Sequence, residues 1–195
     1  MERYAAVTGR RRIRISASVL VALVLALAPV QAGAKEPFTL ETVRDQVKQD
    51  YAGVAHLPAD ALAAALARED GVLLLDVRES EEYAVSRIPG AVRVDPRIWS
   101  WSFLRRHAEA AKGKTVVFYC SVGVRSSRLA ASVQKALKER GAEAVYNLDG
   151  GIFNWHGQER RLSNEGGETS FVHPYDRHWG QLVRRSHLAR TTPAK

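Results

Sequence analysis

The sequence contains a single cysteine, Cys120, and a single methionine, Met1. One thiol cannot form an internal disulfide, so the disulfide-stapled class of small exported domains is excluded. The sequence also lacks internal repeats and low-complexity tracts, which excludes repeat and compositionally biased architectures. A lone thiol is a liability unless it is buried or has a use, so Cys120 is the first candidate for chemistry.

The composition is that of an ordinary globular protein. Apolar residues make up 46% and charged residues 26% of the 195 residues, which is enough for one α/β domain with a substantial core. The formal net charge is +8, but residues 1–34 hold five arginines against one glutamate, so about half of the excess belongs to that segment. The small positive charge that remains on residues 35–195 suits an anionic small substrate and does not indicate a nucleic-acid partner.

Residues 1–34 have the organisation of a secretory signal peptide. A basic stretch at 9–14 precedes an apolar run at 17–27, and small residues at 32–34 form a cleavage pattern before Lys35. The apolar run is shorter than the ~20 residues of a spanning helix, which favours cleavage over an uncleaved membrane anchor. We therefore expect a periplasmic or secreted protein with no stable membrane insertion after cleavage.

The order of apolar runs and amphipathic stretches predicts an α/β fold. Continuous or β-branched apolar runs predict five strands, and helical spacing with capping residues predicts helices between them. The strands are expected at 54–57, 72–75, 91–94, 115–119 and 144–146, and the helices at 39–47, 58–68, 79–85, 98–111, from Ser126 as N-cap to Gly141, and around 153–155.

Strands and helices that alternate across short loops imply a parallel sheet with helices on both faces. We therefore expect a five-stranded parallel sheet in a domain of residues 53–157, preceded by a helical segment at 35–52. Residues 158–195 have no clear period. They are expected to form a C-terminal extension that is either draped on the domain or loose. Residues 171–175 and 179–180 are its candidates for docking on the domain, near the site, and a packing role is favoured over substrate screening or partner binding.

Cys120 directly follows the strand predicted at 115–119, and a helix follows a few residues later. Ligands of parallel sheets gather at the carboxyl ends of strands, where loop amides and the positive end of a helix dipole can lower the pKa of a thiol. Gly123 gives the loop the freedom to curl, and Arg125 adds a cation that either pairs with an anionic substrate or holds the loop. This arrangement favours a reactive thiol over a cysteine that is simply buried.

Three segments resemble the signatures of rhodanese domains. They occur in the family's order, and together they span about residues 54–157. Ser86 and Arg87 depart from the usual Gly-His pair, a change that we expect a surface turn to tolerate. The segments are residues 75–78 (Leu-Asp-Val-Arg) with 82–83 (Glu-Tyr) and 88–91 (Ile-Pro-Gly-Ala), residues 118–126 (Phe-Tyr-Cys-Ser-Val-Gly-Val-Arg-Ser), and residues 149–152 (Asp-Gly-Gly-Ile) with Trp155.

The resemblance implies a sulfurtransferase that needs no metal and no organic cofactor. Cys120 would take the outer sulfur of a donor such as thiosulfate or polysulfide and pass it to cyanide, a small thiol or a protein acceptor. Asp76 and Arg78 are expected to brace the sheet edge and loop. The persulfide would be held by the loop amides of Ser121, Val122, Gly123, Val124, Arg125 and Ser126.

Rival functions remain open beside this resemblance. Phosphatases and arsenate reductases of related fold place five residues between cysteine and arginine, whereas four separate Cys120 from Arg125, which fits a persulfide better. A non-catalytic sulfur carrier or protein-interaction module is the other alternative, although inactive relatives often lack the cysteine.

Two further groups of residues carry weaker signals. His173 and His178 have no companion ligands at metal-site spacing, so core or surface histidines are expected. Trp99 and Trp101 precede Arg105 and Arg106, a pattern that fits either nucleic-acid stacking or a helix that buries its tryptophan face and exposes its arginines.

Overall fold

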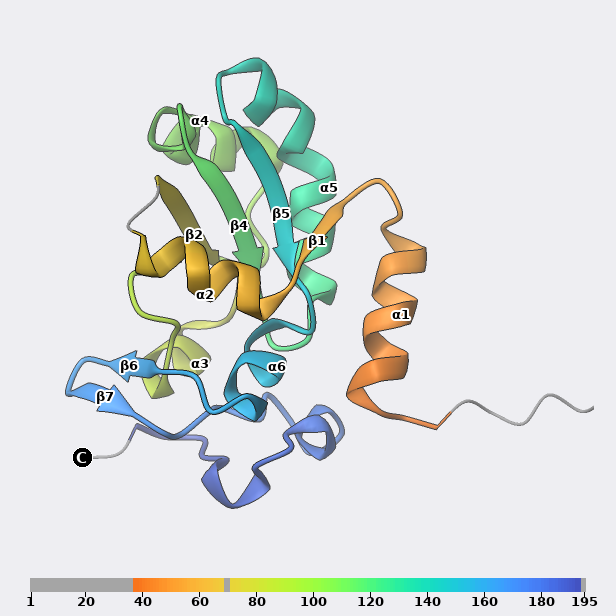
Figure 1. Ribbon diagram of the computed structural model, residues 1–195, viewed down its shortest axis with the longest axis vertical. Helices are drawn as coiled ribbons and strands as arrows, with labels where there is room; N and C mark the ends of the chain where they lie inside the picture. The colour runs from red at the N-terminus through yellow and green to blue at the C-terminus, as the bar shows by residue number, and fades with distance from the viewer. Residues whose placement is uncertain (1–36, 69–70, 194–195) are drawn as a thin grey trace, which may run out of the picture. The chain divides into compact units, whose positions relative to one another are not determined.

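Five strands form the central sheet: β1 (Ala55–Leu57), β2 (Val72–Asp76), β3 (Val92–Arg93), β4 (Thr115–Tyr119) and β5 (Ala144–Leu148). All of them pair in parallel, in the order β1-β5-β4-β2-β3. Figure 1 shows β1, β5, β4 and β2 side by side. The computed structural model describes residues 37–68 and 71–193, which belong to one compact unit. The predicted five-stranded parallel sheet is confirmed.

Within the described residues, six α-helices accompany the sheet, close to their predicted positions. Thr39 caps the first of them with its side chain, as expected, and Gly123 rather than Ser126 caps the fifth. The prediction for Ser126 was wrong because the loop closes earlier, through the positive φ of Gly123. The helices are α1 (Leu40–Asp50), α2 (Ala59–Ala67), α3 (Ser80–Val85), α4 (Ser100–Ala111), α5 (Val124–Glu139) and α6 (Gly151–Gly157).

Helices cover both faces of the sheet, and each face has its own apolar cluster. On one face Leu62 of α2 and Phe153 of α6 pack with Leu74 and Val117. On the other face the helices α4 and α5 pack through residues such as Phe103, with Val116 and Phe118 of β4. Because alternate residues of β4 point to opposite faces, its continuous apolar run serves both clusters.

The C-terminal extension is ordered over residues 158–193. It contains a hairpin of β6 (Leu162–Asn164) and β7 (Gly167–Thr169), which the sequence pattern did not predict, and two short 3-10 helices, η1 (Trp179–Leu182) and η2 (Ser186–Leu188). Leu162, Val172 and Leu182 are buried in the core cluster beside α2 and α6. The extension is therefore draped on the domain and part of its core.

The extension also covers a segment expected at the surface. The backbone of Arg87 pairs with Ser163 of β6 in both directions, at 2.8 and 2.9 Å. Ser86 is fully buried, and its carbonyl accepts a 2.6 Å hydrogen bond from Arg78. The expectation of a surface turn at Ser86 was wrong, since β6 packs over it.

The tryptophans of the α4 segment are exposed. Trp99 is 75% and Trp101 63% accessible, while the helix buries Ser102, Phe103 and Ala108. The alternative in which this helix buries its tryptophan face is therefore wrong.

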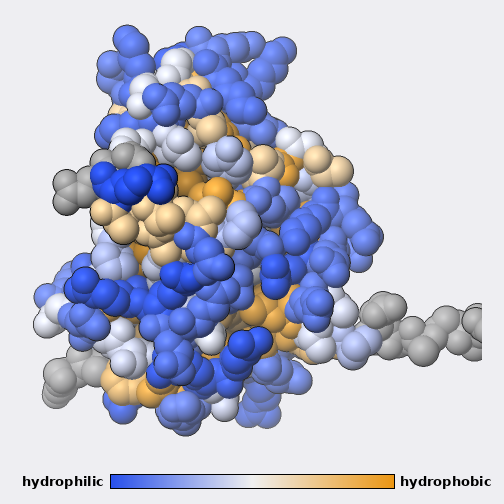
Figure 2. Space-filling model, viewed as in Figure 1, coloured by the Kyte–Doolittle hydropathy of each residue, from blue (hydrophilic) through white to orange (hydrophobic). Residues whose placement is uncertain are grey.

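Hydrophilic side chains cover most of the face shown in Figure 2, and apolar ones gather over the alanine-rich α2. Within residues 37–68 and 71–193, no helix is long and apolar enough to cross a membrane, and no three metal-ligating side chains cluster. The signal-peptide prediction for residues 1–34 lies outside the described residues.

Candidate active site

Cys120 lies at the carboxyl end of β4, at the start of a tight loop into α5. The backbone N–H of Gly123 donates a hydrogen bond to Sγ of Cys120 at 3.2 Å. Gly123 reaches this position with a φ of 109°, in the region that favours glycine. The loop therefore curls around the sulfur, which is buried except for 1% of the residue's surface.

The N-terminus of α6 holds the outer side of this loop. The N–H groups of Ile152 and Phe153 donate to the carbonyls of Cys120 and Ser121 at 2.9 and 3.0 Å. A Cβ added to Gly151 would lie 2.4 Å from the Cys120 carbonyl oxygen, so only glycine fits there. Because these carbonyls point toward α6, the loop can direct its amides inward.

Arg125 is bound to a buried glutamate from the start of α3. Its two terminal nitrogens donate to the two carboxylate oxygens of Glu82 at 2.7 and 2.8 Å. The Ser121 hydroxyl joins the same network, donating to Glu82 at 2.8 Å and accepting from Arg125 at 2.9 Å. Of the two roles considered for Arg125, the geometry favours holding the loop, because a bidentate pair fixes its planar head.

The pKa of the Cys120 thiol lies below its ordinary value. Burial alone would raise this pKa, but the nearby Arg125 cation and the hydrogen bonds from Ser126 and Gly123 outweigh that effect. The reactive thiolate is therefore populated at lower pH than for a free cysteine. Glu82 remains charged beside the loop, since its pairing with Arg125 outweighs burial and lowers its pKa.

Replacing Arg125 with glutamine should raise the pKa of Cys120, because the main favourable charge disappears while the Glu82 carboxylate remains. The rate of alkylation by iodoacetamide follows the thiolate, so its pH midpoint should move upward by about one to two pH units. Arg128→Gln, one turn along α5 and exposed, is the matched control and should leave the midpoint in place. Equal midpoints for wild type and Arg125→Gln would contradict this account.

A pocket of about 190 Å³ opens over Cys120. Part of its wall comes from the C-terminal extension, through Tyr175 and Trp179. The guanidinium of Arg125 lies 4.7 Å from the centre of the Tyr175 ring, so the extension covers one side of the loop network. The other lining residues belong to the cysteine loop and the start of α5: Cys120, Ser121, Val122, Val124 and Arg125.

Aromatic contacts with Phe38 hold the extension in this place, and a histidine hydrogen bond shapes its chain locally. His178 stacks on Phe38 with ring centres 4.2 Å apart, and Phe38 also meets the edge of Trp179. The backbone N–H of Tyr175 donates to Nδ1 of His173 at 3.0 Å. The two histidines are thus packing and hydrogen-bonding residues, as expected, and the extension docks on the domain beside the cysteine.

Asp76 and Arg78 form a separate buried network behind the loop. Both side chains are fully buried and pair through two hydrogen bonds of 2.8 and 2.6 Å. The Tyr119 hydroxyl donates to Asp76 at 2.7 Å and accepts the Ile88 N–H at 3.2 Å. This network connects the ends of β2 and β4 and lies outside the wall of the cysteine pocket.

Two polar contacts support the loop from β5 and α1. The Ser126 hydroxyl donates to Asn147 at 2.6 Å. Asp149, which precedes the glycine pair of the closing motif, binds Arg44 at 2.5 Å and Lys48 at 3.1 Å. The helical segment before the domain therefore pairs with the same end of the sheet as the cysteine loop.

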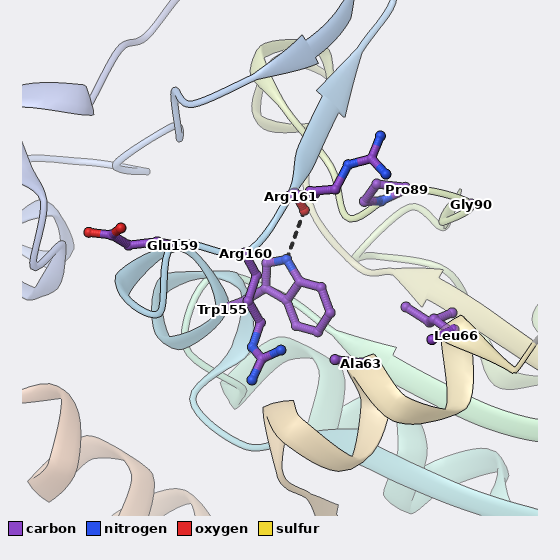
Figure 3. A pocket seen from close by; sticks show the side chains of 9 residues that line it. Ala63, Leu66, Pro89, Gly90, Trp155, Glu159, Arg160 and Arg161 are labelled. Carbon is purple, nitrogen blue, oxygen red and sulfur yellow. Dashed lines mark hydrogen bonds between the residues drawn. The ribbon is translucent and has the colours of Figure 1, made fainter.

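A larger hollow of about 710 Å³ lies between α2 and the end of α6 (Figure 3). The indole of Trp155 lies between Ala63 and Arg161 in this view, and its N–H donates to the Arg161 carbonyl at 2.9 Å. Its lining includes no thiol, hydroxyl or imidazole among the described residues. The smaller pocket at Cys120 is therefore the candidate active site.

The sequence model of the rhodanese-like domain matches residues 58–158, just over half of the chain, and the chain belongs to this family. A sulfurtransferase of Allochromatium vinosum is 34% identical over 102 residues, which cover 52% of this chain and 88% of that protein. A thiosulfate sulfurtransferase structure from Pseudomonas aeruginosa shares the fold, with a TM-score of 0.50 and 21% identity over 75% of this chain and 26% of that one.

Other relatives are named for a different reaction. A tRNA uridine(34) hydroxylase of Bartonella henselae is 35% identical over 96 residues, 47% of this chain and 30% of that protein. The chain spans between 28% and 39% of the length of the first hydroxylases that it matches. Taken together, these relatives support a sulfurtransferase-type or related enzyme.

The structure adds three side chains to the site that the sequence analysis did not assign to it. Glu82 stood in the first signature, but its pairing with Arg125 joins positions 43 residues apart. Tyr175 and Trp179 lie outside the segment that matches the family. Only the aromatic content of the extension hinted at their position.

Proposed function

We propose that the protein is an exported sulfurtransferase that carries sulfane sulfur as a persulfide on Cys120. The Cys120 thiolate attacks the outer sulfur of thiosulfate, the S–S bond of the donor breaks, and sulfite leaves with the bonding pair. With a polysulfide donor, the shortened polysulfide chain leaves in the same way. A thiolate or cyanide then attacks the outer sulfur of the persulfide and returns Cys120 to the thiolate.

One observation carries this proposal: a thiol of lowered pKa receives a loop N–H at its sulfur, at the base of a small pocket. The positive ends of α5 and α6 both approach the loop, which favours the negative charge on a persulfide. Asp76 and Arg78 support the sheet ends without touching the pocket.

The rival functions have less support. A phosphatase loop needs an arginine that is free to hold phosphate, whereas the terminal nitrogens of Arg125 are bound to Glu82. The first hydroxylases are matched over only 28% to 39% of their length, whereas the Allochromatium sulfurtransferase is matched over 88% of its length. A protein-interaction module would not require a thiol activated in this way, whereas a sulfur carrier would use the same thiol.

Intact mass after incubation with thiosulfate, and separately with polysulfide, tests the proposal. We expect the protein to gain one sulfur atom, which cyanide or a thiol removes, and Cys120→Ser to gain none. Gain with polysulfide alone would assign a different donor to the same chemistry. Failure to gain sulfur from either donor would overturn the sulfurtransferase proposal and favour the interaction module.

Export is part of this proposal and has its own test. Residues 1–34 carry the signal-peptide pattern, and α1 begins only at Leu40, so cleavage before Lys35 would leave the described elements intact. N-terminal sequencing of the secreted or periplasmic product should start near Lys35. An intact Met1 in the membrane fraction would contradict export by cleavage.

A further inference from the structure

A surface around the start of α4 has no role in the chemistry above. We call it the tryptophan–arginine surface. Trp99 and Trp101 are 75% and 63% accessible, which is unusual for the largest apolar side chain. Arg105 lies over the ring of Trp101 at 5.2 Å. The surface comprises Trp99, Trp101, Arg93, Arg97, Arg105, Arg106 and Arg128, and all seven side chains are exposed.

Two hollows of different character meet on this surface. One, of about 450 Å³, is lined by apolar groups that include Pro96, Ile98 and Trp99. The other, of about 310 Å³, is lined by three arginines with a single carboxylate, and it shares Arg97 and Ile98 with the first. An apolar side chain and an acidic side chain on one partner could therefore enter neighbouring hollows. The lining cations of the second hollow are Arg93, Arg97 and Arg106.

The positive charge of this surface is largely uncompensated. Within the described ranges, Arg93, Arg106 and Arg128 have no carboxylate partner, and Arg97 has only exposed contacts with Glu79 and Asp95 at 3.4 and 3.6 Å. All five cations are arginines. Trp and Arg are the residues enriched at the centres of protein–protein interfaces, whereas phosphate-binding surfaces draw on lysine as well.

The surface reaches the rim of the cysteine pocket. Arg128 follows Val124 by four residues on α5, so the two share one helix face, and Val124 lines the pocket. On the other side, Arg97 contacts Glu79, whose backbone N–H donates to the carboxylate of Glu82 at 3.0 Å. A partner seated on the surface would therefore lie beside the opening over Cys120.

We propose that the tryptophan–arginine surface docks an acidic protein partner that exchanges sulfur with Cys120. The partner presents a carboxylate to the arginine-lined hollow, an apolar side chain to the hollow beside Trp99, and a cysteine to the pocket. This inference rests on the proposed function. The partner's thiolate attacks the outer sulfur of the Cys120 persulfide, the S–S bond breaks, and Cys120 leaves as the thiolate.

A synthetic peptide tests this docking on the full chain. The probe is a fluorescein-labelled peptide of glutamates around one leucine, with a terminal cysteine, beside a matched peptide in which lysines replace the glutamates. Anisotropy measures binding, and intact mass measures sulfur transfer to the peptide cysteine. The variant is Trp99→Ala with Arg128→Gln, and the control is Lys138→Gln, which removes an exposed charge at the far end of α5.

We expect the acidic peptide to bind the native chain and the control alike, and to bind the double variant about tenfold more weakly. Removal of the persulfide by cyanide should be the same in all three proteins, because the substituted side chains do not line the pocket. Equal binding of the two peptides, or unchanged binding by the double variant, would overturn the docking proposal. The docking proposal would also be overturned if a single-stranded RNA oligonucleotide bound the native chain more tightly than the acidic peptide and the double variant lost that binding.

The two proposals fail in different ways. If Cys120 takes up no sulfur, the proposed function fails, while the anisotropy measurement still decides whether the surface binds acidic protein. If sulfur loads and cyanide removes it but the acidic peptide shows no preference, only the docking proposal fails.

Discussion

Replacing Gly151 with alanine is expected to slow sulfur uptake by Cys120 about a hundredfold, the loss typical of a small misplacement of reacting groups. The added Cβ would lie 2.4 Å from the carbonyl oxygen of Cys120 and 2.7 Å from that of Ser121. Both neighbours are backbone atoms, so the loop itself must move. Gly151 also has a φ of 55°, which strains any other residue.

The rate of mass gain with a fixed donor measures this effect. Gly53→Ala is the matched control, because a Cβ there meets nothing within 4 Å. Thermal unfolding of both variants separates a displaced loop from a destabilised fold. Native uptake rates in Gly151→Ala would show that the contacts of α6 with the loop do not shape the site.

Replacing Asp76 with alanine should lower the free energy of unfolding by about 3–5 kcal/mol, because it leaves the charge of Arg78 buried without its partner. Arg78 is fully buried, and Asp76 accepts two of its hydrogen bonds together with that of Tyr119. The pKa of Arg78 is raised above its ordinary value, because attraction to Asp76 outweighs the effect of burial. The guanidinium is therefore charged in the folded protein. Urea unfolding measures the change.

An exposed ion pair provides the contrast. Glu168 binds Arg161 at 3.1 Å with both side chains mostly exposed, so Glu168→Ala should change stability by less than about 1 kcal/mol. A similarly small effect of Asp76→Ala would mean that water or a rearranged Tyr119 compensates for the lost carboxylate. The expectation that Asp76 and Arg78 brace the structure would then lose its basis.

Much of the sheet could be predicted because its signals are local. The apolar run from Val72 to Leu75 and the β-branched run from Thr115 to Tyr119 each form a strand by themselves, and short loops between strands and helices require parallel pairing. The position of Cys120 at a strand end followed from the same runs. Strand and helix ends differ from the prediction by a few residues, because tertiary hydrogen bonds decide where a helix or strand ends.

The parts that sequence reasoning missed depend on contacts between distant residues. Arg125 could pair with a substrate or with a protein group, and only the fold brings Glu82 within 2.7 Å of it. The extension has no periodic pattern, so neither its hairpin nor the approach of Tyr175 and Trp179 to the pocket follows from it. For the α4 segment, the burial of Phe103 fixes which face is exposed.

The bonds from Ile152 and Phe153 to the loop carbonyls also join the nucleophile to residues that follow it in the sequence. The chain makes its nucleophile well before it makes the residues that shape the loop around it. Before it folds, the chain therefore carries a cysteine of ordinary reactivity. The thiol gains its lowered pKa only in the folded chain, where Arg125 and the hydrogen bonds from Ser126 and Gly123 surround it.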